Sequence, residues 1–172
     1  MIENLVGYLA GLPKELITAV VAMTPIAELR GAIPWALSEP PVGGGLGWRD
    51  AYVWAVIGNV VPVIPLLLAL ESISNALRGY ALFDRFFAWL FERTRRKSKI
   101  VEKYGPLGLA LFVGIPLPLT GAWTGCVAAF LFGIRFRYAF PAIVAGVLLA
   151  GVVVTLAWLG VLAGVRSIFT AA

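Results

Sequence analysis

Uncharged apolar runs separated by short charged segments dominate the hydrophobic pattern of this chain. Ala51–Leu70 contains 20 residues without a charge, and Tyr138–Val165 contains 28. A helix that crosses a bilayer needs about 20 such residues, so each run predicts a full transmembrane helix. Pro62 and Pro65 lie inside the first run and predict a kink there. The pattern therefore indicates an all-α integral membrane protein.

Two other apolar regions are interrupted and predict helical hairpins. Leu16–Ala27 has 12 uncharged residues, too few to cross a bilayer, and Gly31–Ser38 continues the apolar pattern after Glu28 and Arg30. With prolines on both sides of this charged pair, we expect the helix to break at Gly31. The segment is then a re-entrant hairpin, which enters the membrane and returns to the same side.

The second interrupted region is Tyr104–Ile134, with 31 uncharged residues. Pro116, Pro118 and Gly121 stand in its middle and predict a second re-entrant hairpin. Each half of the chain then holds one hairpin and one full helix, and the two halves form an inverted repeat. If residues 105–134 instead form one continuous span, the termini fall on opposite sides and the inversion disappears.

A basic linker joins the two halves. Residues 71–103 hold eight of the fourteen Lys and Arg residues, and apolar side chains recur there at helical spacing. This predicts a basic amphipathic helix at the membrane interface. Residues 1–172 then form one membrane domain, divided into 1–70, the linker 71–103 and 104–172. The linker charges are interpreted as topological signals, and a phosphate-binding regulatory site is the alternative.

The positive-inside rule orients this architecture. The linker together with Arg135 and Arg137 carries ten of the fourteen positive charges. This face is therefore predicted to be cytoplasmic, with both termini outside the cell membrane. The hairpins would enter from opposite sides, with their tips near the bilayer midplane.

Composition supports a membrane protein and excludes several kinds of site. Hydrophobic residues make up 60% of the chain and charged residues 13%, whereas soluble domains have about 25% charged residues. The net charge of +5 therefore reports topology and does not indicate nucleic acid. One cysteine and no histidine exclude an internal disulfide, a Cys/His zinc site and a His-based triad. No cofactor, metal or cleavable targeting peptide is expected.

The candidate chemistry centres on Glu28 and Arg30. An ionisable residue within a membrane segment is a functional-site hypothesis by default. We expect Glu28 to exchange a proton and Arg30 to hold an anionic group. The alternative is a permanent clamp, in which Arg30 ties Glu28 and the free carbonyls of the second hairpin.

Other candidates gather at the two hairpin tips. Helix N-termini near Gly31 and Gly121 would direct partial positive charge inward. Asn59 could satisfy a carbonyl freed by Pro62 or contact substrate. Gly121 and Gly125 allow close helix packing, and Cys126 is expected to be a small packed side chain. The predicted substrate-binding residues are Arg30, Gly31, Asn59, Pro116, Pro118, Thr120, Gly121, Trp123 and Thr124.

Two segments carry a family resemblance. Glu28-Leu29-Arg30-Gly31-Ala32-Ile33-Pro34 and Pro116-Leu117-Pro118-Leu119-Thr120-Gly121-Ala122-Trp123-Thr124-Gly125 resemble the small multidrug export proteins. That family is similar to the wider DedA-like group. The resemblance implies hairpins in inverted repeat and proton-coupled transport. DedA-like relatives are associated with moving lipid-linked phosphates. A glycine is expected near Leu119, so this tip is less flexible here.

These observations predict a proton-coupled secondary transporter or lipid flippase. Its substrate would be amphipathic and anionic, similar to a polyprenyl phosphate, because Arg30 and two helix N-termini favour an anion. The alternatives are an exporter of cationic or amphipathic drugs and a structural or channel-like membrane protein. An enzyme is disfavoured, because no base or second carboxylate accompanies Glu28. Membrane lipid and protons are the expected partners, and a homodimer could shield the hairpin tips.

Overall fold

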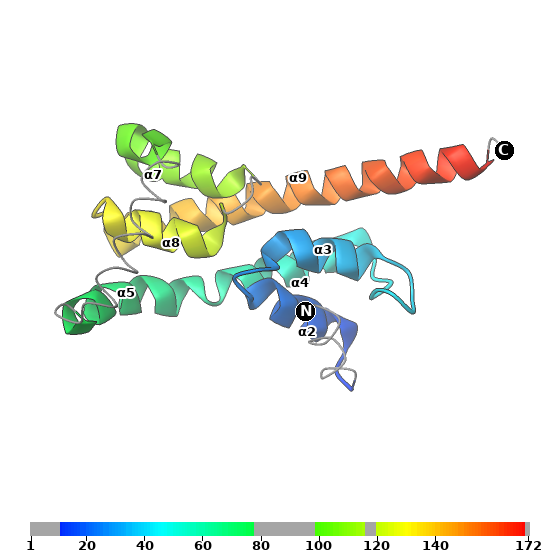
Figure 1. Ribbon diagram of the computed structural model, residues 1–172, viewed down its shortest axis with the longest axis horizontal. Helices are drawn as coiled ribbons and strands as arrows, with labels where there is room; N and C mark the ends of the chain where they lie inside the picture. The colour runs from blue at the N-terminus through cyan, green and yellow to red at the C-terminus, as the bar shows by residue number, and fades with distance from the viewer. Residues whose placement is uncertain (1–10, 78–98, 116–119, 171–172) are drawn as a thin grey trace. The chain divides into compact units, whose positions relative to one another are not determined.

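The computed structural model describes residues 11–77, 99–115 and 120–170, and the regular structure within them is helical (Figure 1). Its contacts divide the chain into two compact units. The first unit consists of Met1–Asn59 and Leu149–Ala172, and the second unit is Val60–Leu148. The predicted linker helix falls largely on residues 78–98, outside the described residues.

In the first unit, helices α2 (Lys14–Met23) and α3 (Glu28–Leu37) pack against each other. Each has ten residues and is about 15 Å long, half the hydrocarbon thickness of about 30 Å. This is the first helix pair that the sequence predicts. Its insertion into a membrane as a re-entrant hairpin stays a prediction.

The break between α2 and α3 lies at Thr24–Ala27, and the prediction of a break at Gly31 is wrong. Thr24 has φ −74° and ψ 140°, the extended conformation that a following proline imposes. The Gly31 N–H, in contrast, donates to the Ala27 carbonyl at 2.8 Å, and α3 continues through Pro34. Pro25 therefore ends the helical path, because it forces Thr24 out of the helical region.

The loop after α3 folds back onto the end of that helix. The N–H groups of Gly44, Gly45 and Leu46 donate to three carbonyls near the end of α3. The acceptors are Trp35 at 2.9 Å, Ser38 at 2.8 Å and Ala36 at 2.8 Å, in that order. Carbonyls that the helix itself leaves unpaired are thereby satisfied.

The first long apolar segment consists of α4 (Trp48–Val60) and α5 (Val63–Leu77). Its part from Trp48 to Leu70 is long and apolar enough to cross a membrane. The interruption before α5 confirms the predicted kink at Pro62. Gly58 lets α4 approach α2 closely, because an added Cβ there would overlap the backbone of Ala19.

In the second unit, α7 (Lys99–Gly114) and α8 (Ala122–Leu131) form a second helix pair, and α8 also packs on α5. A sharp bend at Gly105, with φ 56° and ψ −128°, leaves a short straight part of α7 after it. Gly125 lies against Val113 and Ile143, and an added Cβ would come 2.5 Å from Val113 Cγ2. The packing role predicted for Gly125 is confirmed.

Helix α9 (Phe136–Thr170) has 35 residues and contains the second candidate span, Phe136–Val161. It extends past Arg166, where the sequence predicts its end. Residues up to Leu148 belong to the second unit and later ones to the first.

Large apolar side chains remain exposed along both candidate spans. Those on α4 and α5 recur every three to four residues and are 44–58% exposed: Val53, Ile57, Val61, Ile64 and Leu68. Leu148, Leu149, Val152, Val153 and Leu156 form a similar set on α9, at 40–65%. Continuous apolar surface of this extent is unusual on a soluble monomer and fits contact with lipid.

Candidate functional site

The turn between α2 and α3 is held by the side chain of Thr24. Its hydroxyl donates to the Val21 carbonyl at 2.8 Å and accepts from the Ala27 N–H at 3.3 Å. Its carbonyl accepts from the Glu28 N–H at 3.1 Å. One residue therefore closes the end of α2 and fixes the backbone that leads into Glu28.

Glu28 is the first residue of α3 and has two unusual properties. Its φ is 44°, and no other described residue apart from glycine has a positive φ. Its side chain is only 8% exposed, and Glu28 is the one buried charged residue in the described part of the chain. A left-handed backbone at a non-glycine residue persists only where its surroundings enforce it, and such strain clusters at functional sites.

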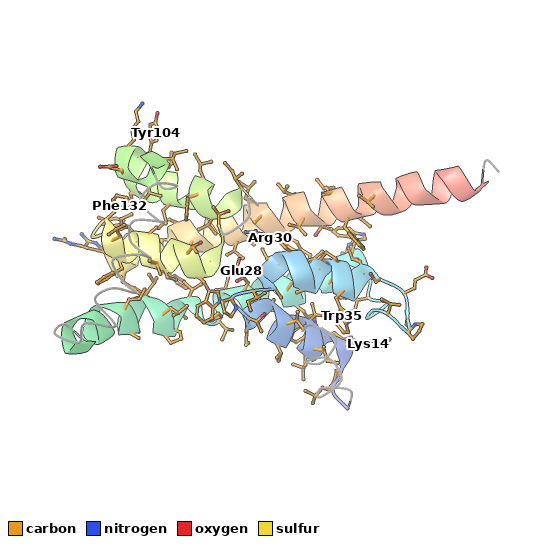
Figure 2. All side chains as sticks on the ribbon, in the orientation of Figure 1. Lys14, Glu28, Arg30, Trp35, Tyr104 and Phe132 are labelled. Carbon is orange, nitrogen blue, oxygen red and sulfur yellow. The ribbon has the colours of Figure 1, made fainter. Side chains whose placement is uncertain are left out.

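Arg30 lies on the same helical turn as Glu28 but is less buried. Figure 2 shows both residues at the end of α3 remote from Trp35. The clamp, in which Arg30 would tie Glu28 and the carbonyls of the second hairpin, stays a prediction. Both residues lie in the first turn of α3, where the helix dipole favours negative charge.

Asn59 lies in the last turn of α4 and is 1% exposed, and its Oδ1 has no hydrogen-bond partner in the described structure. Two further buried atoms, Thr155 Oγ1 and Trp158 Nε1, are also without partners. All three lie in the first unit, as does Glu28. Leaving a buried polar atom unpaired costs about 1–3 kcal/mol, so these polar groups would gain from a hydrogen bond to water or to a ligand.

The residues predicted for the second tip lie in the second unit. Thr120 is buried, and its hydroxyl donates to the Ile115 carbonyl at 2.9 Å. The Thr124 hydroxyl donates to the Gly121 carbonyl at 3.2 Å. Gly121 is the N-cap of α8, close to where the sequence places this helix start. Both hydroxyl protons thus stabilise the turn that leads into α8.

The remaining predicted residues fall into three groups. Gly31 lies inside α3 rather than at its start, and Trp123 is half-buried in the first turn of α8. Pro116 and Pro118 lie outside the described residues. The structure therefore brings Glu28, Arg30 and Gly31 onto one helix, whereas the meeting of the two tips stays a prediction.

A family model described as "Putative small multi-drug export protein" matches residues 28–153, about three quarters of the chain. The chain belongs to this family. The match begins at Glu28, so it includes both charged residues of the first tip and every predicted residue of the second. No curated protein and no solved structure matches the chain.

The family is described as an export family, and the two apolar candidate spans fit a membrane protein. Export is a transport function and not an enzyme class. The described structure contains two helix pairs and two candidate spans, and the inverted repeat that the resemblance implies stays a prediction.

Sequence reasoning missed Thr24, Thr155 and Trp158. A threonine directly before a proline is a turn signal that could have identified Thr24. Nothing in the sequence distinguishes Thr155 from a threonine that bonds within its own helix, because its unpaired hydroxyl depends on the packing around α9.

Proposed function

We propose that this member of the small multidrug export family is a proton-coupled secondary transporter in the cell membrane. Glu28 carries the proton. The observation that supports this role most strongly is the burial of Glu28 in a left-handed backbone at the start of α3. A carboxylate that exchanges a proton alternates between a charged and a neutral form. Where the carboxylate is buried and its backbone is fixed, this change in charge alters its interactions with the surrounding residues.

The two helix pairs are proposed to be re-entrant hairpins in inverted repeat. The element order supports this, because the pair α2 and α3 precedes the first candidate span, Trp48–Leu70, and the pair α7 and α8 precedes the second, Phe136–Val161. Helices α2, α3 and α8 have ten residues each and reach about half the hydrocarbon thickness. Their tips would face each other at the midplane, with the linker cytoplasmic and both termini outside.

The preferred substrate is an amphipathic anion, with a polyprenyl-phosphate-like lipid as the leading candidate. Arg30 has no ion pair within the described chain, and it occupies the positive end of the α3 dipole. Both features favour a phosphate or carboxylate. A cationic or amphipathic drug is the second candidate, favoured by the description of the family.

Reconstituted liposomes with an imposed pH gradient test the proton role. Proton flux, exposure of a lipid phosphate and uptake of a cationic dye are followed in parallel. Transport by the wild type should follow the gradient, whereas Glu28→Gln should abolish gradient-driven transport. Glu102→Gln is the matched control, because it removes an exposed carboxylate from α7.

Each arm of the assay can refute a different part of the proposal. If neither substrate moves in the wild type, the transport proposal fails. If Glu28→Gln responds to the gradient as the wild type does, Glu28 is not the proton carrier. Loss of lipid-phosphate movement in Arg30→Gln, but not in Arg49→Gln, supports an anionic substrate. Movement of the cationic dye alone favours the second candidate.

A further inference from the structure

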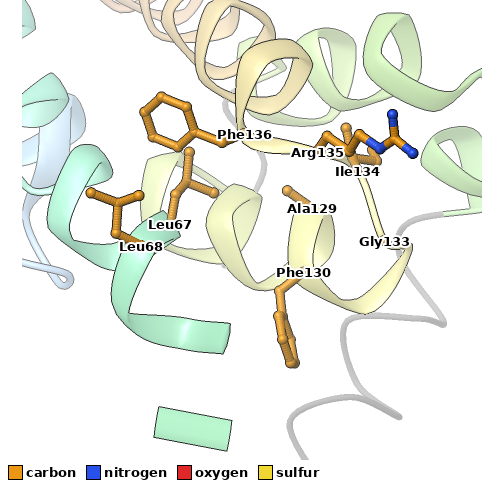
Figure 3. A pocket seen from close by; sticks show the side chains of 8 residues that line it. All are labelled: Leu67, Leu68, Ala129, Phe130, Gly133, Ile134, Arg135 and Phe136. Atoms are coloured by element: carbon orange, nitrogen blue, oxygen red, sulfur yellow. The ribbon is translucent and has the colours of Figure 1, made fainter. Parts of the chain in front are cut away.

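The second unit contains a pocket of about 310 Å³, where α5, the end of α8 and the start of α9 converge (Figure 3). Its volume lies at the lower end of the range for small-ligand sites. The lining side chains other than Arg135 are apolar, with Leu67 and Leu68 from α5 and Phe130, Ile134 and Phe136 from the end of α8 and the start of α9, while polar atoms also contribute to the pocket surface. Arg135 is the single charged residue in the lining.

A tight turn after α8 builds the charged edge of this pocket. Gly133 has φ 63°, its N–H donates to the Phe130 carbonyl at 3.1 Å, and the Ile134 N–H donates to the Ala129 carbonyl at 2.9 Å. These bonds form a Schellman motif, which satisfies carbonyls at the end of the helix. An anion at Arg135 would therefore not face a row of unpaired carbonyl oxygens.

Arg135 also stands where the sequence changes from apolar to charged. It follows the uncharged stretch of α8 directly and precedes the uncharged part of α9. Two residues on, Arg137 is exposed and stacks over the Tyr138 ring at 4.7 Å. Arginine beside exposed tyrosine at the end of an apolar span is typical of the depth of lipid headgroups.

We propose that this pocket binds one anionic phospholipid of the bilayer. Its phosphate would pair with Arg135, and part of an acyl chain would fill the apolar space. In Figure 3 the Arg135 guanidinium points away from the apolar side chains, which suits a ligand with a charged head and an apolar tail. Because Leu68 is 58% and Phe136 42% exposed, a chain can enter from the lipid phase. A water-soluble anion would gain nothing from these walls.

Native mass spectrometry of the full-length protein in detergent tests this assignment. Phosphatidylglycerol and phosphatidylcholine with the same acyl chains are added in turn. The wild type should bind phosphatidylglycerol about five- to tenfold more tightly, since one arginine near a lipid surface contributes an effect of this size. Arg135→Gln should lose this preference. Arg137→Gln removes the same charge outside the pocket and should retain it.

A second variant tests the acyl chain. Leu68→Trp enlarges an exposed wall residue, so the fold should tolerate it while the pocket is filled, and binding of both lipids should fall. Equal binding of the two lipids by the wild type would overturn the proposal. Loss of the preference in Arg137→Gln as fully as in Arg135→Gln would also overturn it. So would normal lipid binding by Leu68→Trp, or displacement of the lipid by millimolar inorganic phosphate. No gradient is imposed, so the outcome is independent of the proposed transport function.

Discussion

The left-handed conformation of Glu28 predicts an unusual order of stability among variants at this position. Glu28→Ala and Glu28→Gly both remove the carboxylate, so they differ only in the presence of a Cβ atom. An L-residue in this conformation is disfavoured by about 1–2 kcal/mol, whereas glycine adopts it freely. With φ at 44°, we expect the glycine substitution to give the more stable protein by about 1 kcal/mol.

Arg30 supplies the matched control, because it lies in the regular part of α3 and has no positive φ. Within a helix, glycine is less favourable than alanine by about 1 kcal/mol. Arg30→Gly should therefore be less stable than Arg30→Ala. The effect of glycine relative to alanine thus changes sign between two positions only two residues apart.

Thermal unfolding in detergent, followed by circular dichroism, measures both pairs. For a chain of this length, about 1 kcal/mol corresponds to roughly 2–4 °C in Tm. Glu28→Gly should unfold above Glu28→Ala by this amount, although neither should support gradient-driven transport. If Glu28→Ala is equally or more stable, the backbone at residue 28 is not strained, and the argument that links strain to function there fails.

Three further substitutions test other features of the fold. Thr24→Val removes two hydrogen bonds at about 1 kcal/mol each and should lower the Tm by roughly 4–8 °C; Thr18→Val, which removes only a bond within α2, should change it far less. Gly125→Val should destabilise by about 1–3 kcal/mol through overpacking, whereas Gly160→Ala, with nothing within 4 Å of the new Cβ, should not lower the Tm. Asn59→Leu removes the unpaired Oδ1 and should leave the Tm unchanged or raised while reducing transport, and a large fall in Tm would contradict the unpaired state.

The two long helices and the two short pairs follow directly from the lengths of the uncharged runs. The positions of the breaks do not, because prolines differ in what they interrupt. Pro25 and Pro62 adjoin the helix ends, whereas Pro34 is accommodated inside α3. A packed helix can tolerate the single backbone N–H that a proline lacks. The sequence alone does not show which proline a helix will accommodate and which will end it. The bend at Gly105 had a sequence signal in its Gly-Pro pair.

The candidate site was predictable where it depends on charge and unpredictable where it depends on geometry. An isolated carboxylate in an apolar stretch already indicates Glu28. Its positive φ and the bridging hydroxyl of Thr24 arise from how two helices join, and hydrophobic periodicity carries no information on that joint. The unpaired Asn59 Oδ1 depends similarly on which neighbours pack around the end of α4.

The loop that caps α3 guides where a reporter can be inserted for topology mapping. The N–H groups of residues 44–46 hold the end of the helix, and an added Cβ at Gly43 would collide with Ser38. Just before them, Val42 is 78% exposed. An epitope or protease site placed beside Val42 should leave α3 intact. The same insertion two residues later would break the hydrogen bonds to the carbonyls at the end of α3. This loop therefore offers an internal position from which the side of the membrane can be determined without altering either terminus.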